Sequence, residues 1–124
     1  MNTRKTTLLV LAGLALISLA GQGLAQDQAS QGKALFEDKC ADCHRTSGLG
    51  LPPTFPALKG SALVQGPPAP LIQVVLKGRK GLATMPAWAP NLDDGQLAAI
   101  LTYVRSAWGN QAPPVTSQQV AGQR

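Results

Sequence analysis

Residues 39–48 read KCADCHRTSG and contain both cysteines and the only histidine of this 124-residue chain. Cys40 and Cys43 are separated by two residues, and His44 follows directly. Three kinds of site use these residue types at close spacing: a structural zinc site, a redox-active thiol pair and a covalent attachment site for haem. Each kind needs different partners elsewhere, so the rest of the chain decides between them.

The rest of the chain argues against zinc and against a thiol pair. Structural zinc has four ligands, nearly always cysteine or histidine, and this chain has three such residues. A redox-active pair lies at the start of a helix in a fold that contains a sheet. Here the cysteines come at the end of a helix expected over residues 29–41, and no alternating apolar run predicts a strand. The motif C-x-x-C-H is instead the attachment signature of c-type haem.

Haem attachment explains the spacing of the motif. Two thiols add to the two vinyl groups of the porphyrin, so the cysteines must be near neighbours, and His44 is then directed toward one face of the iron. Met85 is the candidate ligand for the other face, because the chain's other methionine is Met1 and because Pro86 keeps the residue before it out of a helix. A methionine that fills a gap in the core is the alternative. Histidine and methionine together form an electron-transfer ligand pair.

The first 25 residues have the features of a secretory signal peptide. A basic start precedes an apolar run over residues 8–20, and the small residues Gly23 and Ala25 stand where a signal peptidase cleaves. The alternative is an uncleaved membrane anchor, but the run is shorter than the ~20 residues that span a bilayer. We therefore expect cleavage after Ala25, a periplasmic location and no contact with the membrane afterwards.

Three segments have helical patterns. They cover residues 29–41, residues 71–77 and residues 94–108, the last with Asp93 as N-cap and Gln96 placed for a capping box. The connections between them are long and rich in proline and glycine, yet they contain large apolar side chains. Loops of this kind are usually functional, so we expect them to wrap around a bound group.

The mature chain is expected to be one small domain over residues 26–110, followed by a disordered tail over residues 111–124, which is polar and contains proline. The net charge of +5 falls to +3 once Arg4 and Lys5 leave with the signal peptide. The one basic cluster is the sequence KGRK at 77–80. A single short cluster is too little for a nucleic-acid-binding surface, so we exclude nucleic acid as a partner.

With these motifs in view, residues 28–110 resemble a class I monohaem cytochrome c. In that family a small residue and an aromatic residue of the N-terminal helix cross the C-terminal helix, and Gly32 and Phe36 match them, with Ile100 and Tyr103 as their partners. The resemblance implies an all-α fold in which three to four helices and long Pro/Gly loops surround one haem, covalently bound through the two cysteines.

The resemblance also implies two further site residues. A proline carbonyl accepts the Nδ1 proton of the ligand histidine in this family, and LPP at 51–53 offers Pro52 or Pro53, of which we favour Pro52. Trp88 follows the methionine in the sequence MPAW, where it packs on the haem, or reaches a propionate with its indole N–H, or belongs to the core.

The function implied is that of a periplasmic one-electron carrier, not an enzyme, with His44 and Met85 as axial ligands. Its partners would be a dehydrogenase that donates electrons and an oxidase or another cytochrome that accepts them, and we expect a monomer. Two alternatives remain. One is an enzyme or sensor with five-coordinate haem, such as a peroxidase, and the other is a permanent cytochrome subunit of a larger dehydrogenase.

Overall fold

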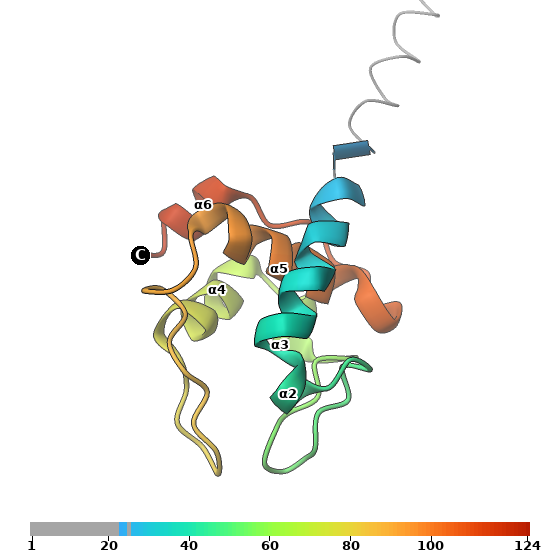
Figure 1. Cartoon of the computed structure of the whole chain (residues 1–124), viewed down its shortest axis with the longest axis vertical. Coiled ribbons are helices and arrows are strands. Elements are labelled where there is room, and N and C mark those ends of the chain that lie inside the picture. The colour runs from blue at the N-terminus through green and yellow to red at the C-terminus, as the bar shows by residue number, and fades with distance from the viewer. Residues whose placement is uncertain (1–22, 25) are drawn as a thin grey trace, which may run out of the picture.

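A computed structural model describes residues 23–24 and 26–124, and these residues form helices joined by loops (Figure 1). The elements are an N-terminal helix over residues 26–39, α2 (Ala41–His44), α3 (Ala62–Gln65), α4 (Pro68–Lys77), α5 (Asp94–Ser106), the 3-10 helix η1 (Ala107–Gly109) and α6 (Ser117–Ala121). Within this described part, β structure is limited to two isolated bridges. The predicted all-α fold is confirmed.

The ends of the predicted helices follow from local chemistry. At the start of α5 the Asp93 carboxylate accepts a hydrogen bond from the backbone N–H of Gln96, and the Gln96 side chain accepts one from the backbone N–H of Asp93. This is the capping box that the sequence predicts. α4 begins at Pro68, earlier than expected, because proline fits the first turn of a helix. It ends before Gly78, whose φ of 74° breaks the helical path.

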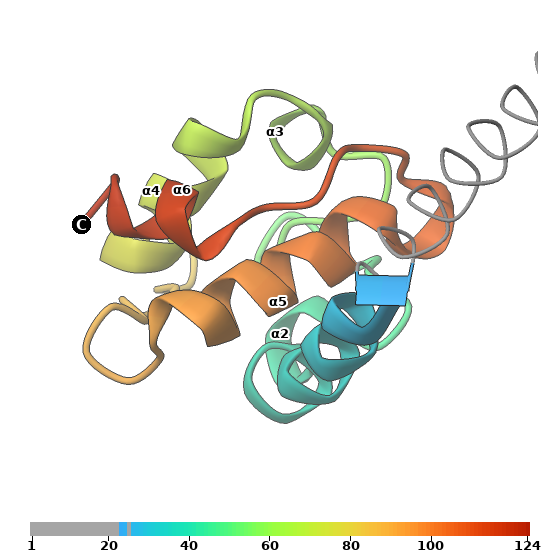
Figure 2. The ribbon, with the colours of Figure 1, turned by 90° about the horizontal axis from the view of Figure 1, so that it is seen from above.

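The N-terminal helix crosses α5 where their backbones touch (Figure 2). A Cβ atom on Gly32 would overlap the carbonyl oxygen of Ala99 and would lie 3.0 Å from the Cβ of Tyr103. The sequence therefore identified the crossing residue of the first helix correctly, but Ala99 takes the place expected for Ile100. Ile100 is buried and faces the cavity described below.

Three aromatic side chains pack against one another beside this crossing. The ring centroids of Phe36, Tyr103 and Trp108 lie 5.3–5.5 Å from one another, a spacing at which tilted aromatic pairs attract each other. α5 ends at Ser106 rather than running on to residue 108, and Trp108 has a φ of 56°. This turn brings the indole N–H to the carbonyl oxygen of Thr46, at 2.9 Å, so Trp108 ties the end of α5 to the loop after the C-x-x-C-H motif.

The prediction of a disordered tail over residues 111–124 was wrong. The tail runs back along α5 to α4, and α6 packs on both helices (Figure 2). Val115 and Val120 have no exposed surface. The Thr102 hydroxyl donates a hydrogen bond to the carbonyl of Val115 and accepts one from its N–H. Two buried valines and paired backbone groups are enough to order a segment whose average composition is polar.

Arg124, the last residue of the tail, binds the segment before α5 and the first residue of α5. Its guanidinium donates hydrogen bonds to the carbonyl oxygens of Ala89 and Leu92, both at 2.9 Å, and forms an ion pair with Asp94. The tail is thus joined to the stretch of chain that links Met85 to α5.

We expect Val120→Ala to destabilise the folded protein by about 2 kcal/mol, because it removes two buried methyl groups and leaves a cavity under α6. Gln118→Ala, an exposed position of the same helix, is the matched control and should change stability by less than about 0.5 kcal/mol. Denaturant unfolding of both variants measures the difference. Equal stabilities would show that the tail does not pack as described.

Two loops extend from the same end of the helices, residues 45–61 after α2 and residues 78–93 after α4 (Figure 1). Their position matters for function, because they form the walls of the main cavity. The predicted signal peptide over residues 1–25 lies outside the described residues except for Gly23 and Leu24. None of the helices in the described part of the chain has the length and apolar character needed to cross a membrane.

Candidate haem site

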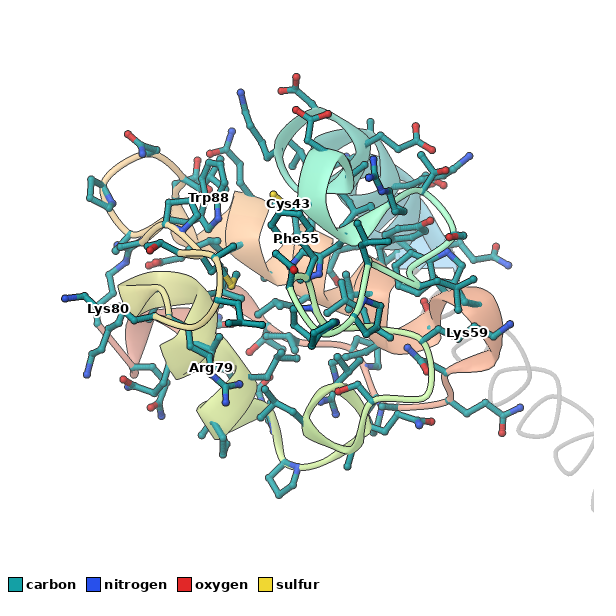
Figure 3. All side chains as sticks on the ribbon, turned by 90° about the horizontal axis from the view of Figure 1, so that it is seen from below. Cys43, Phe55, Lys59, Arg79, Lys80 and Trp88 are labelled. Atoms are coloured by element: carbon teal, nitrogen blue, oxygen red, sulfur yellow. The ribbon has the colours of Figure 1, made fainter. Side chains whose placement is uncertain are left out.

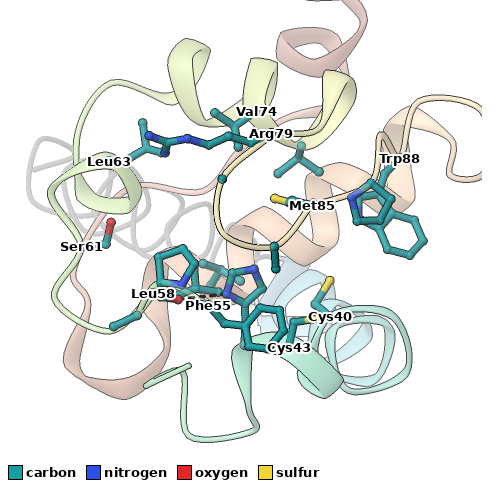
Figure 4. A pocket seen from close by; sticks show the side chains of 18 of the residues that line it. Cys40, Cys43, Phe55, Leu58, Ser61, Leu63, Val74, Arg79, Met85 and Trp88 are labelled. Carbon is teal, nitrogen blue, oxygen red and sulfur yellow. Dashed lines mark hydrogen bonds between the residues drawn. The ribbon is translucent and has the colours of Figure 1, made fainter. Parts of the chain in front are cut away.

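A cavity of about 630 Å³ lies between the two loops, the N-terminal helix, α4 and α5 (Figure 4). This volume is typical of sites that hold a small organic molecule, about 300–1,000 Å³. Apolar side chains make up most of the lining. Five of the six residues that the sequence predicts for the site line this cavity, namely Cys40, Cys43, His44, Met85 and Trp88. Pro52 does not.

Both cysteines are free thiols at the edge of this cavity. Cys40 is the N-cap of α2, and Cys43 follows one turn later. Burial, with the negative charge of Cys43 as a second cause, raises the pKa of the Cys40 thiol to about 11. A thiol with a raised pKa stays protonated near neutral pH, so Cys40 is not an activated nucleophile in this structure.

The motif does not gather ligands for zinc either. Across the described residues, no three side chains of histidine, cysteine, aspartate or glutamate lie close enough together to hold a metal ion. A structural zinc site needs four such ligands.

His44 is buried and is held in one orientation. Its Nδ1 lies 3.1 Å from the carbonyl oxygen of Pro56. Because a carbonyl can only accept, this contact requires a proton on Nδ1, so in the neutral imidazole Nε2 is the nitrogen that has the lone pair. This is the arrangement in which a second contact orients a ligand histidine and raises its basicity.

The choice of Pro52 as the partner of His44 was wrong, and the turn that contains it explains why. Leu51 and Phe55 exchange two backbone hydrogen bonds of 2.9 and 3.0 Å, so the residues between them form the tip of the loop and Pro52 is exposed there. The chain turns back after Phe55, and this brings the next proline, Pro56, to the imidazole. The sequence LPPTFP holds three prolines, and its spacing alone does not show where the chain turns.

Met85 lies across the cavity from the motif, on a loop that is fixed at both ends. The backbone groups of Arg79 and Met85 exchange hydrogen bonds of 3.0 and 2.9 Å, and the N–H of Trp88 donates to the carbonyl of Val75 in α4. In Figure 4 the Met85 thioether and the thiols of Cys40 and Cys43 point into the same space. The loop therefore presents the sulfur of Met85 from an extended backbone, as the following proline predicts.

Gly78 allows this loop to close. Its φ is 74°, and a Cβ at this position would lie 2.5 Å from the carbonyl oxygen of Met85 and 2.8 Å from the backbone nitrogen of Ala87. Any side chain here would push the segment that carries Met85 outward.

Trp88 contributes to both the cavity and the core. Its half-buried side chain lines the cavity and packs against the apolar cluster of the buried helices. Packing on a haem and belonging to the core, two of the roles that the sequence left open for Trp88, are therefore compatible.

These groups fit a haem. An apolar cavity of suitable volume has two free thiols at its edge, an imidazole nitrogen with a free lone pair and a thioether sulfur. This donor set is the one that cytochromes c use.

Comparisons with known proteins agree with this fit. Residues 27–104 match the family described as "Cytochrome C oxidase, cbb3-type, subunit III". The chain is 34% identical to the gluconate 2-dehydrogenase cytochrome c subunit of Pantoea cypripedii over 79% of its length and 25% of that protein. It is 30% identical to the cbb3-type cytochrome c oxidase subunit CcoP of Azospirillum sp. (strain B510), over 77% of this chain and 34% of that one.

A relative of similar size is the cytochrome c-552 of Thermus thermophilus. It is 30% identical, over 86% of this chain and 81% of that protein. The dehydrogenase and oxidase subunits are much longer, and the chain spans only about a quarter to a third of them. The matched region includes the cysteine motif, Met85 and most of α5. The chain therefore belongs to the cytochrome c family.

Proposed function

We propose that this chain is a periplasmic one-electron carrier with a single haem, attached covalently to Cys40 and Cys43 and ligated by His44 and Met85. The observation that carries the proposal is the convergence of these four side chains on one cavity. When bound, the haem would supply one-electron exchange between ferric and ferrous iron. The residues of the protein would hold the porphyrin, orient the two axial ligands and exclude water.

The role of each residue follows from its position. The two thiols at the cavity edge would hold the porphyrin, and the Pro56 carbonyl keeps the His44 proton on Nδ1, so that Nε2 is available to the iron. The hydrogen bonds around Met85 hold its sulfur in the cavity. Leu71, Ile100 and Val104 line the apolar wall, which would exclude water and so favour the less charged, reduced form.

Met85→Leu should leave haem attached but remove one axial ligand. We expect loss of the charge-transfer absorption band that a bond from methionine to ferric iron produces, a high-spin or newly ligated iron, and a lower reduction potential, because thioether ligation favours ferrous iron. Leu82→Ala, an exposed position of the same loop, should retain the band and the potential. An unchanged potential in Met85→Leu would contradict the assignment.

The same spectra separate a carrier from a five-coordinate haem enzyme or sensor. If Met85 occupies the sixth position, the reduced protein should bind carbon monoxide slowly, and the Met85→Leu variant should bind it much faster. Rapid binding by the unsubstituted protein would favour the enzyme or sensor.

The periplasmic location rests on the signal peptide predicted over residues 1–25. Mass spectrometry of the protein from a periplasmic extract should show a chain that begins at Gln26. A chain that keeps the leader and stays with the membrane fraction would indicate an N-terminal anchor instead.

The partners of a carrier would be a dehydrogenase that donates electrons and an oxidase or another cytochrome that accepts them, met in brief encounters at small interfaces. A permanent subunit of a larger dehydrogenase is the second candidate, because relatives such as the Pantoea protein are named as subunits. A free carrier should elute as a monomer on gel filtration, whereas a subunit should co-purify with its enzyme.

A further inference from the structure

Arg105 is a charged side chain in the interior of the protein. It lies in the last turn of α5, and only 3% of its surface is exposed. Burying a charge costs free energy unless hydrogen bonds or an opposite charge compensate for the lost water. A guanidinium stays protonated at every ordinary pH, so this position carries a permanent positive charge inside the fold.

Three carbonyl groups surround the guanidinium. Its Nη1 donates hydrogen bonds of 2.8 and 2.9 Å to the carbonyl oxygens of Val64 and Gly66, and its Nε donates one of 2.8 Å to that of Pro113. These acceptors belong to α3, to the residue that ends α3 and to the tail, which runs between α3 and α5 in Figure 2. Arg105 therefore joins three segments that are far apart in the sequence.

Within the described part of the chain, no carboxylate forms an ion pair with Arg105. The cations of the ion pairs found there are Lys33, Lys39 and Arg124. Carbonyl groups are dipoles, and they offset only part of a full charge. A neutral glutamine side chain could donate to two carbonyls without the cost of burying a charge, so hydrogen bonding alone does not explain an arginine at this position.

The charge lies directly behind the wall of the main cavity. Val64, whose carbonyl accepts a hydrogen bond from Nη1, lines the cavity, and so does Val104, the neighbour of Arg105 in α5. Arg105 itself is not part of the lining, so the guanidinium is held by the protein backbone and not by a molecule in the cavity. Salt and water screen a buried charge weakly, so a cofactor in the cavity would experience its field.

We propose that the buried charge of Arg105 raises the reduction potential of the iron held in this cavity. This inference rests on the proposed function. Ferrous iron carries one positive charge less than ferric iron, so a nearby cation disfavours the oxidised form more than the reduced form. A raised potential favours acceptance of an electron from a donor, and it restricts onward transfer to acceptors of still higher potential.

Arg105→Gln tests the charge, because it removes the cation and keeps side-chain N–H donors for the carbonyls. We expect a lower potential than in the unsubstituted protein, with an equilibrium constant for reduction at least about threefold smaller. Equilibrium titration with redox mediators measures this constant.

Lys59→Gln is the matched control for the loss of one positive charge. Lys59 is exposed on the loop before α3, and its side chain projects outward in Figure 3. This variant should lower the potential less than Arg105→Gln does. In about 1 M salt, where screening acts over about 3 Å, the effect of Lys59→Gln should disappear and most of the effect of Arg105→Gln should remain.

Arg105→Lys separates the charge from the hydrogen bonds. Lysine keeps the cation and loses the planar donor geometry, so the potential should stay near that of the unsubstituted protein. A decrease as large as that of Arg105→Gln would overturn the proposal, because the geometry of the guanidinium would then be its cause. If the glutamine variant folds poorly, Arg105→Met provides a second neutral side chain of similar length and should give the same decrease.

The potentials are compared between variants that keep the low-spin absorption spectrum of the unsubstituted protein, so that the loss of an axial ligand does not imitate the effect. A neutral variant with this spectrum and an unchanged potential would refute the role of Arg105 while the haem assignment stood. If mass spectrometry found no covalent haem in the unsubstituted protein, the inference and the proposed function would fail together.

Discussion

His44→Ala should abolish the low-spin haem spectrum of the protein. The imidazole is buried, is oriented by Pro56 and is the one histidine in the chain. No other imidazole can replace it, and water is a weaker ligand. Even the loss of a group that only orients a ligand commonly costs about 10–100-fold in metal affinity, so we expect the low-spin fraction to fall by more than about tenfold. Optical and electron paramagnetic resonance spectra, scaled to haem content, measure this fraction.

Asp42→Asn is the matched control for His44→Ala. Asp42 lies within the same motif and lines the cavity, but its side chain is exposed. This variant should keep both the attached haem and the low-spin spectrum. A normal low-spin spectrum in His44→Ala would exclude His44 as a ligand, whatever the control shows.

Gly32→Ala should destabilise the protein by about 3 kcal/mol or more, at the upper end of the cost of overpacking a core. The added methyl group would overlap the carbonyl oxygen of Ala99, and a backbone atom cannot move aside as a flexible side chain can. Alanine favours a helix over glycine by about 1 kcal/mol, so the substitution would stabilise the helix if the two helices were apart. The substitution therefore destabilises the protein only if the N-terminal helix and α5 are in contact at Gly32.

Denaturant unfolding of the haem-loaded protein measures this effect. Gln31→Ala, an exposed position of the same helix, is the control and should change stability by less than about 0.5 kcal/mol. A Gly32→Ala variant as stable as the unsubstituted protein would mean that the N-terminal helix and α5 do not touch at this point.

Much of the fold could be predicted because it depends on local signals. The capping box at Asp93, the proline-to-glycine limits of α4 and the small residue at Gly32 are each recognised within a few positions of the chain. The candidate haem residues were found in the same way, because Cys40, Cys43 and His44 are adjacent in sequence and Met85 had no competitor after the signal peptide.

The parts of the prediction that failed depend on turns and packing that composition and helical periodicity do not show. Which proline meets His44 is decided by the turn closed between Leu51 and Phe55, and composition does not show that turn. The tail was judged by its average polarity, although Thr116 and Gln119 form a capping box visible in the sequence. The role of Trp108 depends on a turn with positive φ, which a helical pattern does not predict.

Intact-mass spectrometry of the exported protein under denaturing conditions tests the central claim most directly, because haem bound without thioether bonds is lost in this measurement. We expect a chain from Gln26 to Arg124 that is heavier than its amino acids by one haem, and equal to the amino-acid mass when Cys40 and Cys43 are both replaced by alanine. A polypeptide whose mass equals that of its amino acids alone would contradict the account.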